Sequence, residues 1–236
     1  METKEFEIKK EKWLQEVADG CHEIAIKNEN YPDFYVFQSQ IFENPDLLNI
    51  GANPAGNETY KDMLQRKQIE RRTKDDLINS SDGKNNEYIS NPDWAISKPI
   101  LEMFSGKRTR EVLENAVIMN AVYFNTKKVE HLGNFKEDKK VMKDFCSNKT
   151  LEFIKDICKP KNILFIGKNA PEWLKIKFHH IDDSVCRTSD GKNYLVVKKY
   201  LNEIPCYIIH HTSMNKSFNT GENLQRKKEF FEKVFE

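Results

Sequence analysis

The sequence repeatedly passes from a short apolar run into a longer stretch of helical character. Apolar runs of this length, bounded by turn residues, are typical of β-strands buried on both faces. Such strands need a layer of helices on each side of the sheet. We therefore predict an α/β fold with three layers, in which helices cover both faces of a mainly parallel central sheet. The expected strands are residues 47–51, 117–124, 163–167, 194–200 and 206–210.

Helices are predicted between these strands and at both ends of the chain. Apolar residues from Phe6 to Val17 recur with helical spacing and predict an N-terminal helix that stops near Gly20. The length of 236 residues fits a single domain, 1–236, with an N-terminal helical extension of about residues 1–30. Further helices are expected at 98–104, from Thr109 onward, at 140–158, after Lys168 and at 221–235.

Charge and composition exclude several classes of protein. The net charge of +1 argues against a protein that coats nucleic acid by bulk charge, although a local basic face remains compatible with it. The charged N-terminus has no apolar segment typical of a signal peptide, and no apolar run reaches membrane-spanning length. We expect a cytoplasmic monomer with no membrane partner.

The five cysteines do not indicate a metal site. They are widely spaced, and none forms the Cys-x-x-Cys pair that zinc and iron–sulfur sites usually contain. Reduced, packed thiols are the simpler interpretation, so we expect neither a metal nor another cofactor.

Polar residues that directly follow the apolar runs are the candidates for chemistry, because ligands bind beyond the carboxyl ends of parallel strands. The run Gly51-Ala52-Asn53-Pro54-Ala55-Gly56 follows the first strand, and its small residues permit close approach of a ligand. His210-His211-Thr212-Ser213 follows the last strand. Asn120 interrupts the apolar run 117–124, where an amide needs a hydrogen-bonding reason. Each pattern alone also fits an ordinary turn or a satisfied buried amide.

Taken together and in order, these segments resemble the uracil-DNA glycosylase superfamily. GANPAG is similar to the asparagine form of its G-x-[DN]-P loop, as in the single-strand-selective and mismatch-specific branches. Asn120 resembles the asparagine that reads the pyrimidine edge, and HHTSMN resembles the late H-[PS]-S loop, with Thr212 in place of the usual proline. IGKNAPEW also resembles the family's third strand and turn, so the resemblance spans about residues 45 to 218.

The resemblance implies a hydrolase that removes uracil or a C5-modified pyrimidine from DNA by a water-mediated mechanism acting on a flipped base. Asn53 would hold the water, His211 would donate to the oxygen of the leaving base, and Asn120 would read its edge. Gly51, Ala52 and Pro54 would line the base site. The DNA-contacting residues would be Ser213, Met214, Asn215, Lys216 and Lys168.

This chain departs from the family pattern at two places. Ala55 stands where the uracil-specific branch carries a tyrosine that blocks C5 substituents, so a wider substrate range is expected. The aromatic residue that stacks on the base is not at the usual spacing, and Tyr60 and Trp94 are the candidates, with Tyr88 behind them. Three basic clusters either contact phosphates or form a solvated face: residues 66–74, 107–110 and 127–128.

Other interpretations remain open. The same residues fit a glycosylase for a bulkier modified base in foreign DNA. They also fit a catalytically weak DNA-binding module with this fold, since an asparagine cannot accept a proton as an aspartate does. An unrelated α/β protein that binds nucleotides or sugars is the third alternative.

Overall fold

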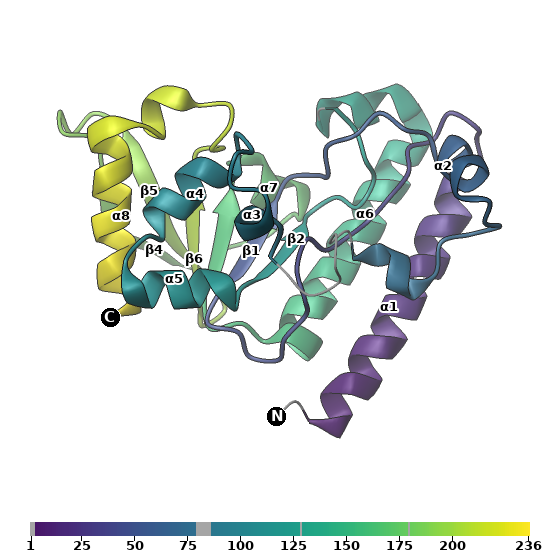
Figure 1. Ribbon diagram of the computed structural model, residues 1–236, viewed down its shortest axis with the longest axis horizontal. Coiled ribbons are helices and arrows are strands. Elements are labelled where there is room, and N and C mark those ends of the chain that lie inside the picture. The colour runs from purple at the N-terminus through teal and green to yellow at the C-terminus, as the bar shows by residue number, and fades with distance from the viewer. Residues whose placement is uncertain (1–2, 79–85, 128, 179) are drawn as a thin grey trace.

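The computed structural model describes residues 3–78, 86–127, 129–178 and 180–236, except the side chains of 129, 130, 133, 136, 137 and 180–185 (Figure 1). Its centre is a six-stranded mixed sheet with the order β2-β1-β3-β6-β5-β4. Four parallel strands form one side: β1 (Leu48–Gly51), β2 (Val117–Asn120), β3 (Ile163–Ile166) and β6 (Ile204–Ile209). The antiparallel strands β5 (Tyr194–Leu201) and β4 (His180–Arg187) extend it.

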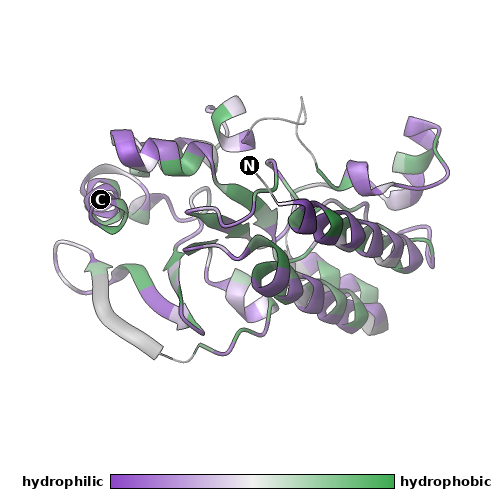
Figure 2. Cartoon of the chain, turned by 90° about the horizontal axis from the view of Figure 1, so that it is seen from below, coloured by the Kyte–Doolittle hydropathy of each residue, from purple (hydrophilic) through white to green (hydrophobic). Residues whose placement is uncertain are grey.

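Helices cover both faces of the sheet, which confirms the predicted α/β fold with three layers. Side chains alternate along each strand. Leu48 and Ile50 therefore point into one core, while Ile118 and Leu164 point into the other. Figure 2 shows the sheet and the surrounding helices coloured by hydropathy. We call the side of the sheet that carries Leu48 and Ile50 the α1 face and the opposite side the α8 face. The α1 face is covered by α1 (Lys4–Ala25), α6 (Lys136–Glu152) and α7 (Asn169–Trp173). The α8 face is covered by α3 (Glu87–Ser90), α4 (Ser97–Met103), α5 (Lys107–Glu114) and α8 (Gly221–Phe235).

The remaining short elements connect these layers. They are α2 (Tyr60–Lys67), η1 (Lys74–Leu77), η2 (Val129–Phe135), the π-helical turn η3 (Phe153–Cys158) that continues α6, and η4 (Lys216–Phe218). No helix of the described part of the chain is long and apolar enough to cross a membrane.

The N-terminal helix differs from the prediction in length and in role. It continues through Gly20 to Ala25, so the predicted stop near Gly20 is wrong. A β-carbon at Gly20 would collide with the ring of Phe145, and glycine therefore serves the close packing of α1 against α6. Trp13 and Val17 are buried in the core, which makes α1 an integral layer of the domain rather than an appendage.

The second strand ends earlier than its apolar sequence predicts. β2 stops at Asn120, and the chain then runs beside the loop that follows β1. The backbone N–H of Ala121 donates to the carbonyl of Gly51 at 2.8 Å, and that of Val122 donates to Ala52 at 3.0 Å. A further bond from Thr126 to Pro54, at 3.3 Å, continues this pairing. The two loops therefore form a common wall above the strand ends.

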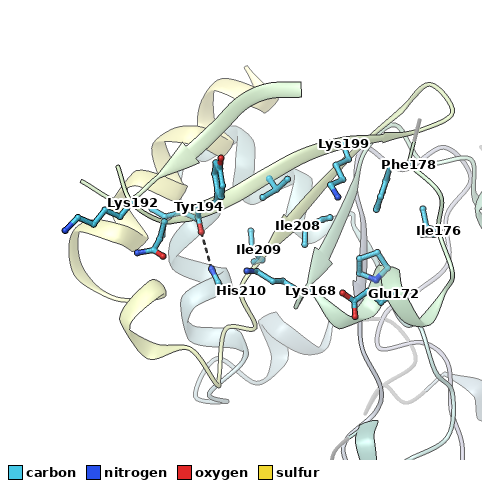
Figure 3. A pocket seen from close by; sticks show the side chains of 14 residues that line it. Lys168, Glu172, Ile176, Phe178, Lys192, Tyr194, Lys199, Ile208, Ile209 and His210 are labelled. Atoms are coloured by element: carbon cyan, nitrogen blue, oxygen red, sulfur yellow. Dashed lines mark hydrogen bonds between the residues drawn. The ribbon is translucent and has the colours of Figure 1, made fainter. Parts of the chain in front are cut away.

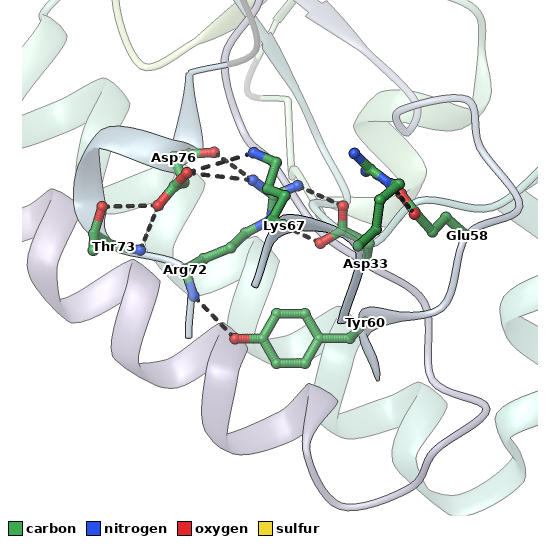
Figure 4. Close-up of polar contacts among 8 residues, drawn as sticks. Asp33, Glu58, Tyr60, Lys67, Arg72, Thr73 and Asp76 are labelled. Carbon is green, nitrogen blue, oxygen red and sulfur yellow. Dashed lines mark hydrogen bonds and ion pairs between the residues drawn. The ribbon is translucent and has the colours of Figure 1, made fainter. Parts of the chain in front are cut away.

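A buried ion pair supports this wall from the α1 side (Figure 4). Arg72 donates from Nε and Nη2 to the two carboxylate oxygens of Asp33, at 2.7 and 2.5 Å. Both side chains are buried. Burial alone lowers the pKa of Arg72, but the hydrogen bonds and the charge of Asp33 raise it above its ordinary value. The carbonyl of Asp33 accepts the N–H of Asn125 at 2.7 Å, which connects the ion pair to the loop after β2.

Candidate functional site

The four parallel strands end at the same edge of the sheet, and polar residues follow each of them. The loop 52–57 follows β1, the loop 121–126 follows β2, Gly167 and Lys168 follow β3, and residues 211–213 lie just beyond β6. We call these segments, together with Gly51 and Asn120 at the ends of β1 and β2, the strand-end site. The structure thus brings together the three motifs that the sequence separates widely.

Asn53 is anchored through only one end of its amide. Its Nδ2 donates to the carbonyls of Pro54 at 2.9 Å and Thr126 at 2.8 Å, and lies 3.0 Å from Oγ1 of Thr126. Three acceptors around one atom identify it as the nitrogen, because only the NH₂ group can donate. Oδ1 of this half-buried residue is therefore the end of the amide that is able to accept a further hydrogen bond.

Asn120 lies beside the Asn53 loop with part of its amide unpaired. It pairs with Gly51 in the register of β1 and β2, and its side chain is only 3% exposed. An ideal β-carbon at Gly51 would lie 3.0 Å from Oδ1 of Asn120, so a glycine there lets the amide approach the backbone. Nδ2 of Asn120 has no hydrogen-bond partner among the described residues. A buried amide nitrogen is nearly always paired, so this one requires a partner such as an ordered water or a bound molecule.

His211 completes the strand-end site from β6. Oγ of Ser213 lies 3.0 Å from Nδ1 of His211, and burial lowers the pKa of the imidazole below its ordinary value of 6.5. His211 is therefore neutral at physiological pH. With Ser213 as the donor, the ring carries its proton on Nε2, which can donate to a ligand.

The backbone of Gly167 brings β3 close to His211. Its φ is +100°, a conformation that side chains with a β-carbon rarely adopt. The ideal β-carbon would lie 3.6 Å from both Cβ and Cδ2 of His211, in ordinary van der Waals contact. Gly167 is therefore required because of its backbone conformation, and not because a larger side chain would lack space.

We expect Gly167→Ala to lower the free energy of unfolding by about 1–3 kcal/mol, because alanine is strained at this φ. Urea unfolding of the two proteins measures the difference. Gly191→Ala is the matched control, since Gly191 also has a positive φ, +69°, but has no atom near its missing β-carbon. Both substitutions cost stability, and only Gly167→Ala places a β-carbon in contact with His211. An unchanged urea midpoint for Gly167→Ala contradicts the expectation.

The two candidate stacking aromatics occupy different environments. Tyr60 is 1% exposed, its ring packs on Phe34 with centroids 5.1 Å apart, and its hydroxyl lies 2.8 Å from Nδ1 of His22. This enclosed ring leaves no face for a base, so the structure does not support Tyr60 as a stacking residue. Trp94 is 42% exposed. Oγ1 of Thr212 donates to the carbonyl of Ile96 at 3.0 Å, so the turn that carries Trp94 lies beside the His211 loop.

The other predicted base-site and DNA-contacting residues differ in exposure. Ala55 is exposed and Ala52 is half-buried, whereas Pro54 is buried. Met214 is one of the most exposed large apolar residues, and Asn215 and Lys216 beside it are exposed as well.

Two residues that were not predicted from the sequence, Asn219 and Lys227, hold the loop 211–215 in place. Nδ2 of Asn219 donates to the carbonyls of His211 at 3.2 Å and Asn215 at 2.8 Å. Nζ of the buried Lys227 donates to Oδ1 of Asn219, and burial lowers the pKa of Lys227 to about 8. In the sequence, this contact is indicated only by the position of Lys227 on the inner side of the amphipathic helix α8.

Most cations of the first two predicted basic clusters form ion pairs with carboxylates of the protein itself. In the first cluster, each cation is paired with a carboxylate: Arg66 with Glu58, Lys67 with Asp76, Arg71 with Asp19, Arg72 with Asp33 and Lys74 with Glu11. In the second, Arg108 pairs with Asp46 and Arg110 with Glu114. By contrast, Lys168 and Lys216 are exposed and form no ion pair with any residue that the structure describes.

A cavity of about 430 Å³ opens next to the strand-end site, toward the α1 face (Figure 3). Its floor includes Phe178 and Ile208, and Lys168 stands at its border with the strand ends. His210 lines it as well, with Nε2 3.1 Å from the carbonyl of Tyr194 and its ring stacked on Phe218 at 4.1 Å. The adjacent histidines therefore have different surroundings, and only His211 belongs to the strand-end site.

No three His, Cys, Asp or Glu side chains within the described ranges gather closely enough to hold a metal ion. The described polar groups of the strand-end site are amides, an imidazole, hydroxyls and an ammonium group, which are able to form hydrogen bonds with a polar organic molecule. No protein-family model matches this chain, and no curated protein sequence matches it.

Proposed function

We propose that this protein is a DNA glycosylase that hydrolyses the N-glycosidic bond of uracil or a C5-modified pyrimidine in base-excision DNA repair. The observation that carries the proposal is the amide of Asn120, which is buried, lacks a partner for Nδ2 and lies in register with the Asn53 loop. An asparagine amide offers a donor and an acceptor together, which is the pattern that a pyrimidine edge requires. The protein acts as a monomer in the cytoplasm.

The reaction uses positioning and charge stabilisation rather than a strong base. Oδ1 of Asn53 accepts a hydrogen bond from the attacking water and holds it below the sugar, while the anchored Nδ2 keeps the amide from rotating. Nε2–H of neutral His211 donates to the oxygen on which negative charge develops as the base leaves.

The DNA lies across the rim of the strand-end site, with the target base turned out of the stack. Lys168 and Lys216 contact the phosphates, since their charges are not neutralised by neighbours. Ser213 contacts the backbone, and Met214 and Asn215 enter the space that the base leaves. Affinity for DNA falls steeply with salt if these lysines bind phosphates.

Base release from labelled oligonucleotides tests the proposal. We expect release from DNA that contains uracil or a C5-modified pyrimidine, with strand cleavage appearing only after alkali treatment. Asn53→Ala is expected to lower the rate about 100-fold, because the water loses its orienting acceptor. Asn57→Ala, in an exposed position of the same loop, is the matched control. No release from any pyrimidine, or equal rates for both variants, refutes the assignment.

A further inference from the structure

The α1 face of the sheet is left partly open beyond β3. One row of residues in register crosses β2, β1, β3, β6 and β5 on this face: Met119, Ile50, Phe165, Ile208 and Val197. The first three are 0% exposed, whereas Ile208 and Val197 are only half-buried. The row therefore leads from the core into the cavity next to the strand-end site, which we call the β5–β6 cavity.

The β5–β6 cavity combines an apolar floor with aromatic side chains at two ends. The half-buried Phe178 lines it together with Val197 and Ile208 (Figure 3). The ring of Phe178 packs edge-on against Phe165, with centroids 6.4 Å apart, which holds it in place. Tyr194 lines the other end and is 45% exposed. A volume of about 430 Å³ lies in the range of sites that hold small organic molecules.

The charged side chains that line the cavity are mostly cations. Lys168, Lys192 and Lys199 line it, and Glu172 supplies the one carboxylate among the described lining residues. None of the three lysines forms an ion pair with a residue that the structure describes. Nζ of Lys199 instead lies 5.0 Å from the centroid of the Phe178 ring. Since the whole chain carries 38 basic and 37 acidic residues, this local excess of positive charge favours an anionic ligand.

The lysines stand at both ends of the apolar floor. Lys199 pairs with Cys206 in β6, whereas Lys168 lies beyond Ile166, which pairs with Ile209. Three residues of β6 separate these two levels, so the lysine positions are more than about 10 Å apart along the strands. A fatty acid would meet only one of them with its single polar end. A ligand with an anionic group at one end and a polar ring at the other suits both.

We propose that the β5–β6 cavity is a nucleotide-binding site, in which the base lies on the floor beside Phe178 and the phosphate binds at Lys168. Contact of bases with aromatic rings and of phosphates with lysines is how proteins hold nucleotides without reading their sequence. The amide of Asn193, another lining residue, offers a donor and an acceptor to the ring edge. The proposal does not depend on glycosylase activity, since Lys168 is the only lining residue shared with the strand-end site.

Calorimetric titration of the protein with adenosine 5′-monophosphate (AMP) tests the proposal. A purine nucleotide is used because the strand-end site is proposed to read a pyrimidine. Adenosine and inorganic phosphate, titrated separately, represent the two halves of the molecule. We expect AMP to bind at least about 10-fold more tightly than either half, because floor and lysines then act on one ligand. AMP binding no tighter than that of phosphate overturns the proposal, since exposed lysines alone then attract the anion.

Substitutions of opposite effect locate the bound nucleotide. Lys168→Met is expected to weaken AMP binding about 10-fold, because a charged hydrogen bond to the phosphate is lost. Glu172→Gln is expected to strengthen it a few-fold, because it removes the carboxylate from the cavity. A gain in affinity does not arise from loss of folding. Lys177→Met is the matched control, since Lys177 is exposed in the same segment and does not line the cavity. Equal affinities of the Lys168→Met and Lys177→Met variants overturn the proposal.

Filling the floor provides a test that leaves every lysine in place. Val197→Phe adds a ring at a half-buried strand position, where phenylalanine is well tolerated. It is expected to weaken AMP binding at least about 10-fold and to leave phosphate binding unchanged. Undiminished AMP binding by a folded Val197→Phe variant contradicts the proposed site. If this variant does not fold, the substitutions at Lys168 and Glu172 decide.

A competition experiment distinguishes a free nucleotide from one that is part of a DNA strand. The probe is a fluorescein-labelled single-stranded oligonucleotide, whose binding is followed by anisotropy as AMP is added. Displacement by AMP shows that the cavity holds a nucleotide of the bound strand, which reaches it past Lys168. Binding unaffected by AMP shows that the cavity takes a free nucleotide. Both results support the nucleotide site, and absence of base release refutes only the proposed function.

Discussion

We expect His211→Ala to slow base release from uracil-containing DNA about 100- to 1000-fold, the effect of removing one donor from a site that stabilises developing negative charge. The substitution removes an imidazole whose Nδ1 lies 3.0 Å from Oγ of Ser213, which leaves Nε2 to donate when Ser213 is the donor to Nδ1. Because charge develops mainly in the transition state, the loss falls on kcat and leaves KM nearly unchanged. Steady-state kinetics on a defined oligonucleotide measure both constants.

His210→Ala is the matched control for this prediction. His210 stacks on Phe218 and faces the neighbouring cavity, so its removal is expected to change kcat only a few-fold. Equal losses for the two histidines contradict the role of His211. A large rise in KM without a fall in kcat contradicts it as well.

The pH dependence of the wild-type rate provides a separate check on His211. Burial lowers the pKa of His211 below its ordinary value of 6.5, so the neutral ring is lost at a lower pH than in an unperturbed histidine. The part of kcat that depends on His211 is therefore expected to be flat near pH 8 and to reach its half-value below pH 6.5. A decline that begins near pH 8 and depends on His211 shows that the ring is not held neutral.

We expect Arg72→Met to lower the free energy of unfolding by about 3–5 kcal/mol, because it leaves the carboxylate of Asp33 buried without its partner. Methionine retains much of the aliphatic volume, so the loss comes mainly from the missing charge and hydrogen bonds. Urea denaturation followed by circular dichroism measures the change. Asn125 is also expected to become more mobile, since Asp33 accepts its backbone N–H.

Arg66→Met is the matched control for the buried ion pair. Arg66 binds Glu58 with equally short hydrogen bonds, at 2.6 and 2.7 Å, but its side chain is 59% exposed. Its removal is expected to cost less than about 1 kcal/mol. The double variant Arg72→Met with Asp33→Leu should recover part of the lost stability, since no unpaired charge then remains. Similar small losses for Arg72→Met and Arg66→Met show that burial does not strengthen the pair.

The sequence predicts the sheet and the position of the site for one physical reason. Parallel strands buried on both faces are apolar throughout, so a polar residue after such a run marks the edge where ligands bind. Asn53 and His211 lie at that edge, and Asn120 lies at the end of β2. Their roles in a reaction remain predictions, because position alone does not establish chemistry.

Other features depend on contacts between distant segments and leave no local pattern. The strand β4 was not predicted, because its sequence, HIDDSVCR, is polar as edge strands usually are. Arg72 stood within an apparently solvated basic run, yet its partner Asp33 lies 39 positions earlier and both are buried.

The paired loops after β1 and β2 have a consequence for redesigning the protein. Their spacing is set by main-chain bonds from Ala121 to Gly51 and from Val122 to Ala52, which any residue except proline can form at the donor positions. Side chains at the exposed positions 55 and 57 can thus be randomised while the frame that carries Asn53 and Asn120 is kept. On the proposed function, substitutions at position 55 would alter which bases are admitted before they altered how the bond is broken, whereas position 57 would serve as the neutral reference.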